Sequence, residues 1–140
     1  MRPFTVACDT DLAPAQAWAR VTDWPAHARW VPLTTIEVTT PPPSGPGTVF
    51  VARTSAGRFG FDDPMEVVTW DAPRFCRIEK RGAALTGWAE LRVEPRGTGA
   101  RVTWREVARP ARLPKFLDPV AAGSGRLLFG RVLRRLLTRP

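Results

Sequence analysis

The feature that most limits the fold is an unbroken series of segments in which apolar and polar residues alternate. A first segment runs from Thr34 through Thr39 to a Pro-rich loop at 41–47. Five more, joined by short turns, span Thr48–Ser55, Phe59–Trp70, Phe75–Arg81, Leu85–Glu94 and Arg101–Ala108. Alternation with a period of two predicts β-strands. Turns as short as Ala56-Gly57 or Gly82 force successive strands to pair antiparallel. The sequence therefore predicts an antiparallel sheet, with a bulge or an edge position at Pro64.

Helical segments lie on both sides of this strand series. A further strand at 3–9 precedes two short helices, at 13–23 and 25–30, and Pro14 suits the first helical position. After the strands, Asp118 and Pro119 form an N-cap pair that opens an amphipathic helix to Leu137, with a start near Pro114 as the alternative. We therefore predict an α+β fold of about seven strands in which the long helix packs against the sheet.

Length and composition restrict the classes of protein that remain. A chain of 140 residues is expected to form a single domain (1–140) with a core and one internal pocket. Hydrophobic residues make up 44% and charged residues 24%, which excludes wholesale disorder. No apolar run reaches the roughly 20 residues that span a bilayer, and the N-terminus does not resemble a signal peptide. We expect a cytoplasmic protein.

The net charge of +8 belongs almost entirely to the C-terminal segment. Eight basic residues and one acidic residue lie between Arg109 and Pro140, which leaves about +1 for the rest of the chain. On the final helix Arg131, Arg134 and Arg135 fall opposite the apolar stripe, as a solvated face would. We therefore expect neither nucleic-acid binding nor membrane contact.

The inventory of metal ligands is poor. One histidine and two isolated cysteines, Cys8 and Cys76, cannot supply a zinc site of ordinary spacing. Both cysteines are expected to be small buried apolar residues rather than a disulfide. The sequence therefore predicts no metal and no cofactor. It leaves the oligomeric state open, a homodimer included.

Several short motifs in a fixed order resemble the START-like (SRPBCC) superfamily, in particular its polyketide cyclase/dehydrase-like bacterial members. The motifs are Ala13-Pro14-Ala15, Thr22-Asp23-Trp24, Trp30-Val31-Pro32, Gly47-Thr48, Val68-Thr69-Trp70-Asp71-Ala72-Pro73-Arg74 and Gly97-Thr98-Gly99-Ala100-Arg101-Val102-Thr103-Trp104. The resemblance implies the helix-grip fold, in which a curved sheet wraps the C-terminal helix around a deep apolar cavity. It also implies a small hydrophobic ligand, but no shared catalytic residue.

The final helix itself indicates a cavity. Its C-terminal half carries bulky apolar residues, whereas positions 121–125 are all small, and two glycines within three helical residues need a reason. Small residues leave space beside a curved sheet, although they also permit close packing of helix and sheet. We expect that these small residues leave a cavity between the helix and the sheet. Nine residues are predicted to line it: Trp30, Phe50, Phe61, Met65, Leu91, Trp104, Ala121, Gly125 and Leu128.

Two titratable residues are candidates for proton transfer. His27 lies between Trp24 and Trp30 at three-residue steps, and Glu106 shares a strand face with Val102 and Trp104. Each has a more ordinary interpretation: His27 as a partly exposed packing residue, and Glu106 as a solvated or ion-paired residue at a strand end. The pattern does not decide which way Arg53, Asp62, Asp63 and Glu66 face, so each is a further candidate for the pocket.

We therefore predict that the chain binds a small hydrophobic molecule, aromatic or polyketide-like, in an internal cavity. The alternative is a cofactor-independent cyclase, aromatase or dehydratase in which His27 and Glu106 transfer protons. A second alternative is a basic peripheral protein that places its last helix on a membrane surface.

Overall fold

The computed structural model describes residues 3–111 and the helix at 118–138, whose side chains are described from residue 123 onward. The strands are β1 (Phe4–Thr10), β2 (Thr34–Val38), β3 (Val49–Ala56), β4 (Phe59–Asp71), β5 (Phe75–Lys80), β6 (Leu85–Arg96) and β7 (Gly99–Pro110). The helices are α1 (Pro14–Val21), α2 (Trp24–His27), the 3-10 turn η1 (Ala28–Trp30) and α3 (Asp118–Thr138). This order confirms the predicted α+β class. The alternative helix start at Pro114 lies outside the described residues.

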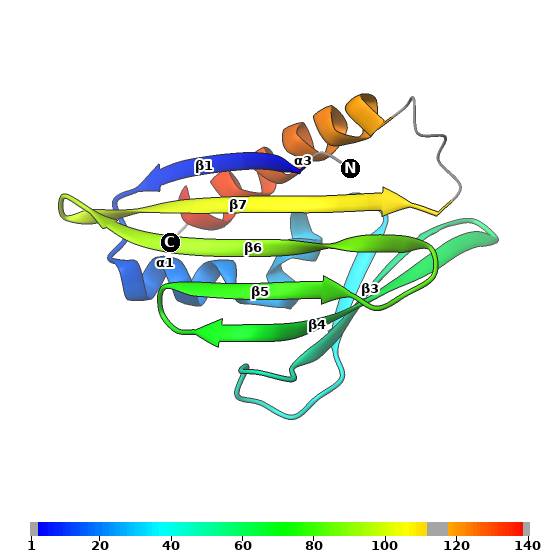
Figure 1. Ribbon diagram of the computed structural model, residues 1–140, viewed down its shortest axis with the longest axis horizontal. Coiled ribbons are helices and arrows are strands. Elements are labelled where there is room, and N and C mark those ends of the chain that lie inside the picture. Colours follow the sequence, from blue (N-terminus) through cyan, green and yellow to red (C-terminus); the bar gives the residue numbers. More distant parts are fainter. Residues whose placement is uncertain (1–2, 112–117, 139–140) are drawn as a thin grey trace.

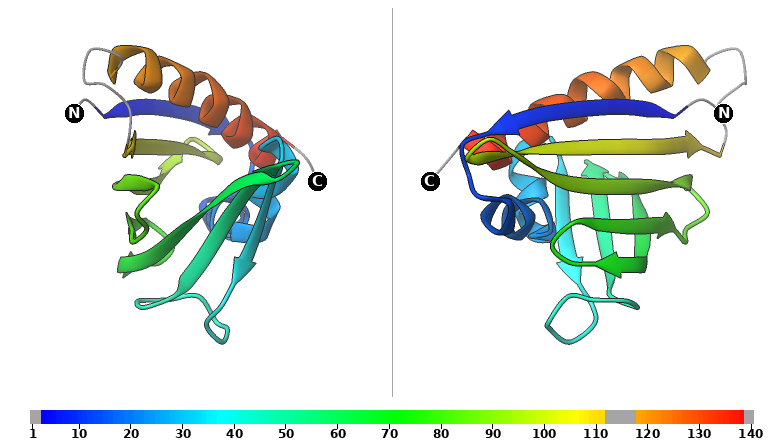
Figure 2. Two further views of the ribbon diagram at one scale, coloured as in Figure 1. Left: turned by 90° about the vertical axis from the view of Figure 1, so that its right-hand side faces the viewer. Right: turned by 60° about the vertical axis from the view of Figure 1, so that its left-hand side comes forward.

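All seven strands form one antiparallel sheet in the order β1-β7-β6-β5-β4-β3-β2 (Figure 1). Neighbours in sequence pair through short turns, and β1 pairs with β7, far away in sequence. The sheet curls, and α3 and the shorter helices lie on its concave side (Figure 2). The concave face therefore supplies the inner wall of the molecule.

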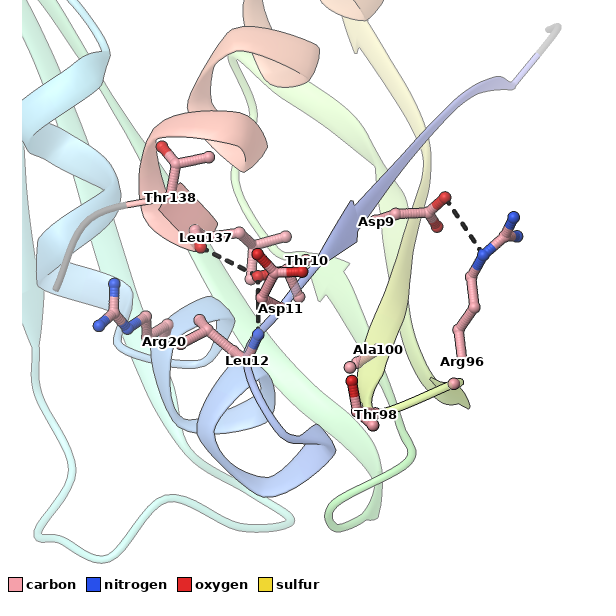
Figure 3. Close-up of a pocket in the computed structure, with 12 residues that line it drawn as sticks. Asp9, Thr10, Asp11, Leu12, Arg20, Arg96, Thr98, Ala100, Leu137 and Thr138 are labelled. Carbon is pink, nitrogen blue, oxygen red and sulfur yellow. Dashed lines mark hydrogen bonds and ion pairs between the residues drawn. The ribbon is translucent and has the colours of Figure 1, made fainter.

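The helix α3 is held most firmly at its C-terminal half. Val132, Leu133, Leu136 and Leu137 are buried, whereas Arg131, Arg134 and Arg135 are exposed on the opposite side, as predicted. The last carbonyl groups of a helix lack partners within the helix. Here the Thr10 hydroxyl donates to the Leu137 carbonyl at 3.1 Å (Figure 3), and the Arg20 guanidinium donates to the Leu136 carbonyl at 3.3 Å.

Gly125 does not have the role that the sequence predicted for it. A Cβ atom at Gly125 would lie 2.7 Å from the ring of Phe4 on β1, so this glycine permits α3 to approach the sheet closely. Gly123, in contrast, has open space around it and is exposed. The prediction that Gly125 lines a cavity is therefore wrong. The side chain of Ala121 lies outside the described residues.

The bulge in β4 lies at a different residue from the one expected. The register between β4 and β5 shifts between Val67 and Thr69, not at Pro64. Pro64 lies just beyond the end of β5, where its carbonyl accepts a hydrogen bond from the Arg81 amide at 2.8 Å. Its ring lies against Gly82, and a Cβ there would approach the Pro64 Cδ to 2.7 Å. Pro64 pairs with Val51 of β3 on its other side, but its missing N–H lies on the side where β5 has already ended, so proline is tolerated there.

Two alanine substitutions on α3 test this packing. Gly123→Ala should raise the free energy of unfolding by up to about 1 kcal/mol, because alanine has a higher helix propensity than glycine and its Cβ would contact no other group. Gly125→Ala gains the same helix propensity, but its Cβ forces the buried Phe4 ring aside. This overpacking lowers the free energy of unfolding by about 1–3 kcal/mol. We expect Gly125→Ala to be the less stable variant in urea-unfolding measurements. Equal stabilisation by both substitutions would contradict close packing at Gly125.

Candidate ligand-binding site

A partly open cavity of about 230 Å³ lies between the concave face of the sheet, α2 and α3. Its wall is mainly apolar and aromatic, and includes Trp24, Phe50, Ile78, Trp104 and Phe129. The volume is below the roughly 300–1,000 Å³ typical of pockets for drug-sized ligands. The cavity therefore suits a molecule with one or two fused rings.

Stacked aromatic pairs shape the cavity wall. Trp24, the first residue of α2, stacks on Phe50 of β3 with ring centroids 4.7 Å apart and an interplanar angle of 9°. Trp104 of β7 stacks on Phe129 of α3 at 4.8 Å. These pairs bring together side chains from the short helix, the sheet and the long helix. Flat, rigid rings of this kind offer large contact surfaces to a planar ligand.

His27 lies inside this aromatic wall. Only 5% of the residue is exposed, and its ring centroid lies 5.3 Å from that of Trp104. Its Nε2–H donates to the Val21 carbonyl at 2.8 Å, and burial lowers the pKa of the imidazole. The ring is therefore neutral at pH 7, and its other nitrogen keeps a lone pair. The expectation of a partly exposed histidine is wrong, because α2 turns this side chain inward.

A buried ion pair forms a polar corner in the cavity. The Lys80 ammonium of β5 lies 2.6 Å from Asp63 Oδ2 of β4, and both side chains are less than 10% exposed. The other carboxylate oxygen, Asp63 Oδ1, is buried without a hydrogen-bond partner. Asp63 faces inward because it lies two residues from Phe61 and from Met65 along β4, and all three side chains share the face that lines the cavity.

Glu106 completes the polar corner from β7. It is 3% exposed, and its Oε1 accepts a hydrogen bond from the Trp104 indole at 3.0 Å. Burial raises the pKa of this carboxyl group; Lys80 opposes the shift and Asp63 adds to it. The interpretation of Glu106 as a solvated residue at a strand end is wrong, because β7 continues to Pro110 and keeps this side chain on the inner face.

Five of the nine predicted lining residues lie on the cavity wall. They are Phe50, Phe61, Met65, Trp104 and Leu128. Trp30 does not line the cavity: it lies on the outer side of η1, where the Arg135 guanidinium stacks 5.3 Å above its ring. Leu91 is not among the lining residues either; it is fully buried and packs in the hydrophobic core.

The strand residues of undecided direction divide between the two faces of the sheet. Arg53 and Asp62 form an exposed ion pair at 2.7 Å, and Glu66 pairs with Arg81 at 3.3 Å, so none of these three lies in the cavity. Only Asp63 of the four points inward. Sequence reasoning missed Lys80; its position opposite Met65 in the β4–β5 pairing was the available signal.

A second and larger hollow lies on the surface, between the end of β1, the β6–β7 turn and the C-terminal end of α3 (Figure 3). Of its charged groups, Asp9 is ion-paired, with Arg101 at 2.8 Å and with Arg96 at 3.4 Å. It is open and lined by polar residues, whereas small-molecule sites are enclosed and mainly apolar. The internal cavity is therefore the better candidate site.

The fold and the cavity are those of a START-like, helix-grip protein. Residues 1–139 match the family described as polyketide cyclase / dehydrase and lipid transport, so the chain belongs to this family. No curated protein matches the sequence. Among the described residues, no helix is both long and apolar enough to cross a bilayer.

Solved structures with low sequence identity share this fold. TTHA0849 from Thermus thermophilus is 14% identical, with 97% of each chain covered and a TM-score of 0.73. Ara h 8.0201 is 15% identical over 99% of each chain, with a TM-score of 0.70. MLL2253 from Mesorhizobium loti is 19% identical over 99% of this chain and 100% of its own, with a TM-score of 0.68. At these identities the likeness shows the fold alone.

The raised pKa of Glu106 predicts an unusual pH dependence of stability. The folded state binds a proton that the unfolded state releases near pH 4.5, so this contribution is complete below pH 4.5 and is lost as pH rises through the folded-state pKa. In Glu106→Gln the amide keeps the acceptor for Trp104 without a titratable group. We expect its free energy of unfolding, relative to wild type, to increase with pH above 4.5 in urea titrations. A pH-independent difference would contradict the raised pKa.

Proposed function

We propose that the protein binds a small hydrophobic, ring-containing molecule in the internal cavity. The observation that carries this proposal is an internal, aromatic-walled cavity of about 230 Å³ in a chain of this family. The described stretches of the chain contain no group of three or more His, Cys, Asp or Glu side chains placed to hold a metal ion. Binding would therefore depend on shape, apolar burial and the few polar groups of the cavity.

Apolar burial supplies the affinity in this proposal. Each square ångström of apolar surface removed from water contributes about 25 cal/mol, and a planar ring between Trp24, Phe50 and Trp104 adds stacking contacts. The interior positions Ala52, Ala89 and Ala108 are small, so the sheet leaves space for a ligand instead of filling it.

A substitution that fills the cavity tests the proposal. Ala89 is buried on the inner face of β6, so Ala89→Leu places three more carbon atoms in the cavity. We expect it to weaken the binding of 2-naphthol at least about 10-fold, the loss of roughly 1.4 kcal/mol. Calorimetric titration of the full chain measures the affinity. Ala7→Leu, at an exposed position of β1, is the matched control and should bind as wild type does. Unchanged affinity in Ala89→Leu would refute binding in this cavity.

A second function, proton transfer on a bound ketone, is favoured by the opposite pKa shifts of two cavity groups. Burial favours the protonated form of Glu106 and the neutral form of His27. An acid and a base kept in these states are what enolisation requires. Glu106 would protonate the carbonyl oxygen while His27 removes a proton from the adjacent carbon, which gives an enol, a Glu106 carboxylate and a His27 imidazolium ion. The reverse transfers restore the ketone and both side chains.

Hydrogen–deuterium exchange at the α-carbon of 2-tetralone tests this second function. In heavy water the wild-type protein should accelerate the exchange, as followed by proton NMR. Glu106→Gln should lower the catalysed rate about 100-fold or more, because the amide cannot donate a proton to the carbonyl oxygen. The affinity for 2-tetralone should fall much less than the rate. Glu90→Gln, on the outer face of β6, is the control. Exchange no faster than in buffer would exclude this activity.

A further inference from the structure

We propose that the cavity selects a ligand with an uncharged hydroxyl group on its ring system, and that this hydroxyl donates a hydrogen bond to Asp63 Oδ1. The inference rests on the proposed binding function and specifies the chemical class of the ligand. It predicts discrimination among molecules with the same apolar ring but different polar groups.

The unpartnered oxygen of Asp63 is the first observation behind this inference. Lys80 satisfies Asp63 Oδ2, whereas Asp63 Oδ1 is buried and has no donor within reach. A buried acceptor without a donor costs about 1–3 kcal/mol, and more when the group is charged. Asp63 lines the cavity, so a ligand could supply the missing donor. A ligand hydroxyl group placed there would donate the missing hydrogen bond and so remove the free-energy cost of the unpartnered oxygen.

The charges around the cavity disfavour an anionic ligand. Among the described residues that line the cavity, Lys80 is the only cation, and it is already paired with Asp63. A carboxylate on the ligand would meet the charged carboxylate of Asp63 and would find no unpaired cation. Like charges repel strongly where water is excluded. Burial of an unpaired anion is costly in itself.

The same groups disfavour a cationic ligand. The Asp63 charge is already offset by Lys80, and burial raises the pKa of Glu106 and so favours its uncharged form. His27 is neutral because burial lowers its pKa. An ammonium group would lose its hydration without meeting an uncompensated negative charge. An uncharged donor avoids this loss, and a hydroxyl group is the smallest such donor that a ring can carry.

A ligand series with one ring system tests the inference on the unmodified protein. Naphthalene, 2-methoxynaphthalene, 2-naphthol, 2-naphthoate and protonated 2-(aminomethyl)naphthalene are titrated into the full chain at pH 7 by calorimetry. We expect 2-naphthol to bind about 10- to 100-fold more tightly than naphthalene, the range for a hydrogen bond to a charged group. The methoxy compound cannot donate a hydrogen bond to Asp63 Oδ1, so it should bind less tightly than 2-naphthol. The carboxylate and the ammonium compound should bind more weakly than 2-naphthol.

The possible outcomes separate this inference from the binding function. Binding of naphthalene with no preference for 2-naphthol would overturn the inference and leave the proposed function standing. Tightest binding of 2-naphthoate or of the ammonium compound would likewise overturn it. If no member of the series binds, the proposed function itself fails, and the inference fails with it.

A double substitution locates the selectivity at Asp63. Asp63→Leu combined with Lys80→Met removes both charges together, so neither is left buried alone. This variant should keep its affinity for naphthalene and lose the preference for 2-naphthol. The matched control removes the exposed pair on the other face of β4, through Asp62→Leu with Arg53→Met, and should keep the preference. A preference that survives in the Asp63–Lys80 variant would overturn the assignment, and the ligand series decides the inference if that variant does not fold.

Discussion

The structure depends on how α3 is fixed to a sheet that curls around it. Its C-terminal half is buried through Leu133 and Leu137, and its last carbonyls are tied to Thr10 and Arg20. Toward the N-terminal half, Gly125 lets the helix lie against Phe4 of the edge strand β1. The helix therefore packs along β1 and β7 and does not fill the concave space over β3, β4 and β5. The cavity is a consequence of where the helix is held.

The sequence predicted the fold more completely than it predicted the site. Strand alternation, short turns and the amphipathic spacing of the last helix are local signals, and all seven strands and the long helix were found from them. Gly125 was assigned to the cavity because the pattern shows which residues are small but not which partner they face. The inward direction of Asp63 depends on Phe61 and Met65 two positions away, in a strand with mixed residues on both faces. Lys80 could be placed in the site only from the β4–β5 register, which puts it opposite Met65.

The polar corner is costly to keep in an apolar cavity. A buried ion pair is often no more stabilising than apolar residues of similar volume, and the pair of Asp63 and Lys80 leaves one carboxylate oxygen without a donor. Glu106 adds a carboxyl group whose charged form is disfavoured by burial. Three apolar side chains would close the cavity wall without these costs. A requirement of the proposed ligand would therefore explain the polar corner better than stability does.

Ligand selection and proton transfer would use the same feature of the cavity, because both depend on the exclusion of water. Burial lowers the pKa of His27 and raises that of Glu106, which favours the neutral form of the base and the protonated form of the acid. The same exclusion makes any charged group on a ligand expensive and an uncharged donor inexpensive. A carrier needs only the second effect, whereas an enzyme needs both and a reacting carbon beside His27. Selectivity for a hydroxyl group would therefore be common to the two functions, and turnover alone distinguishes them.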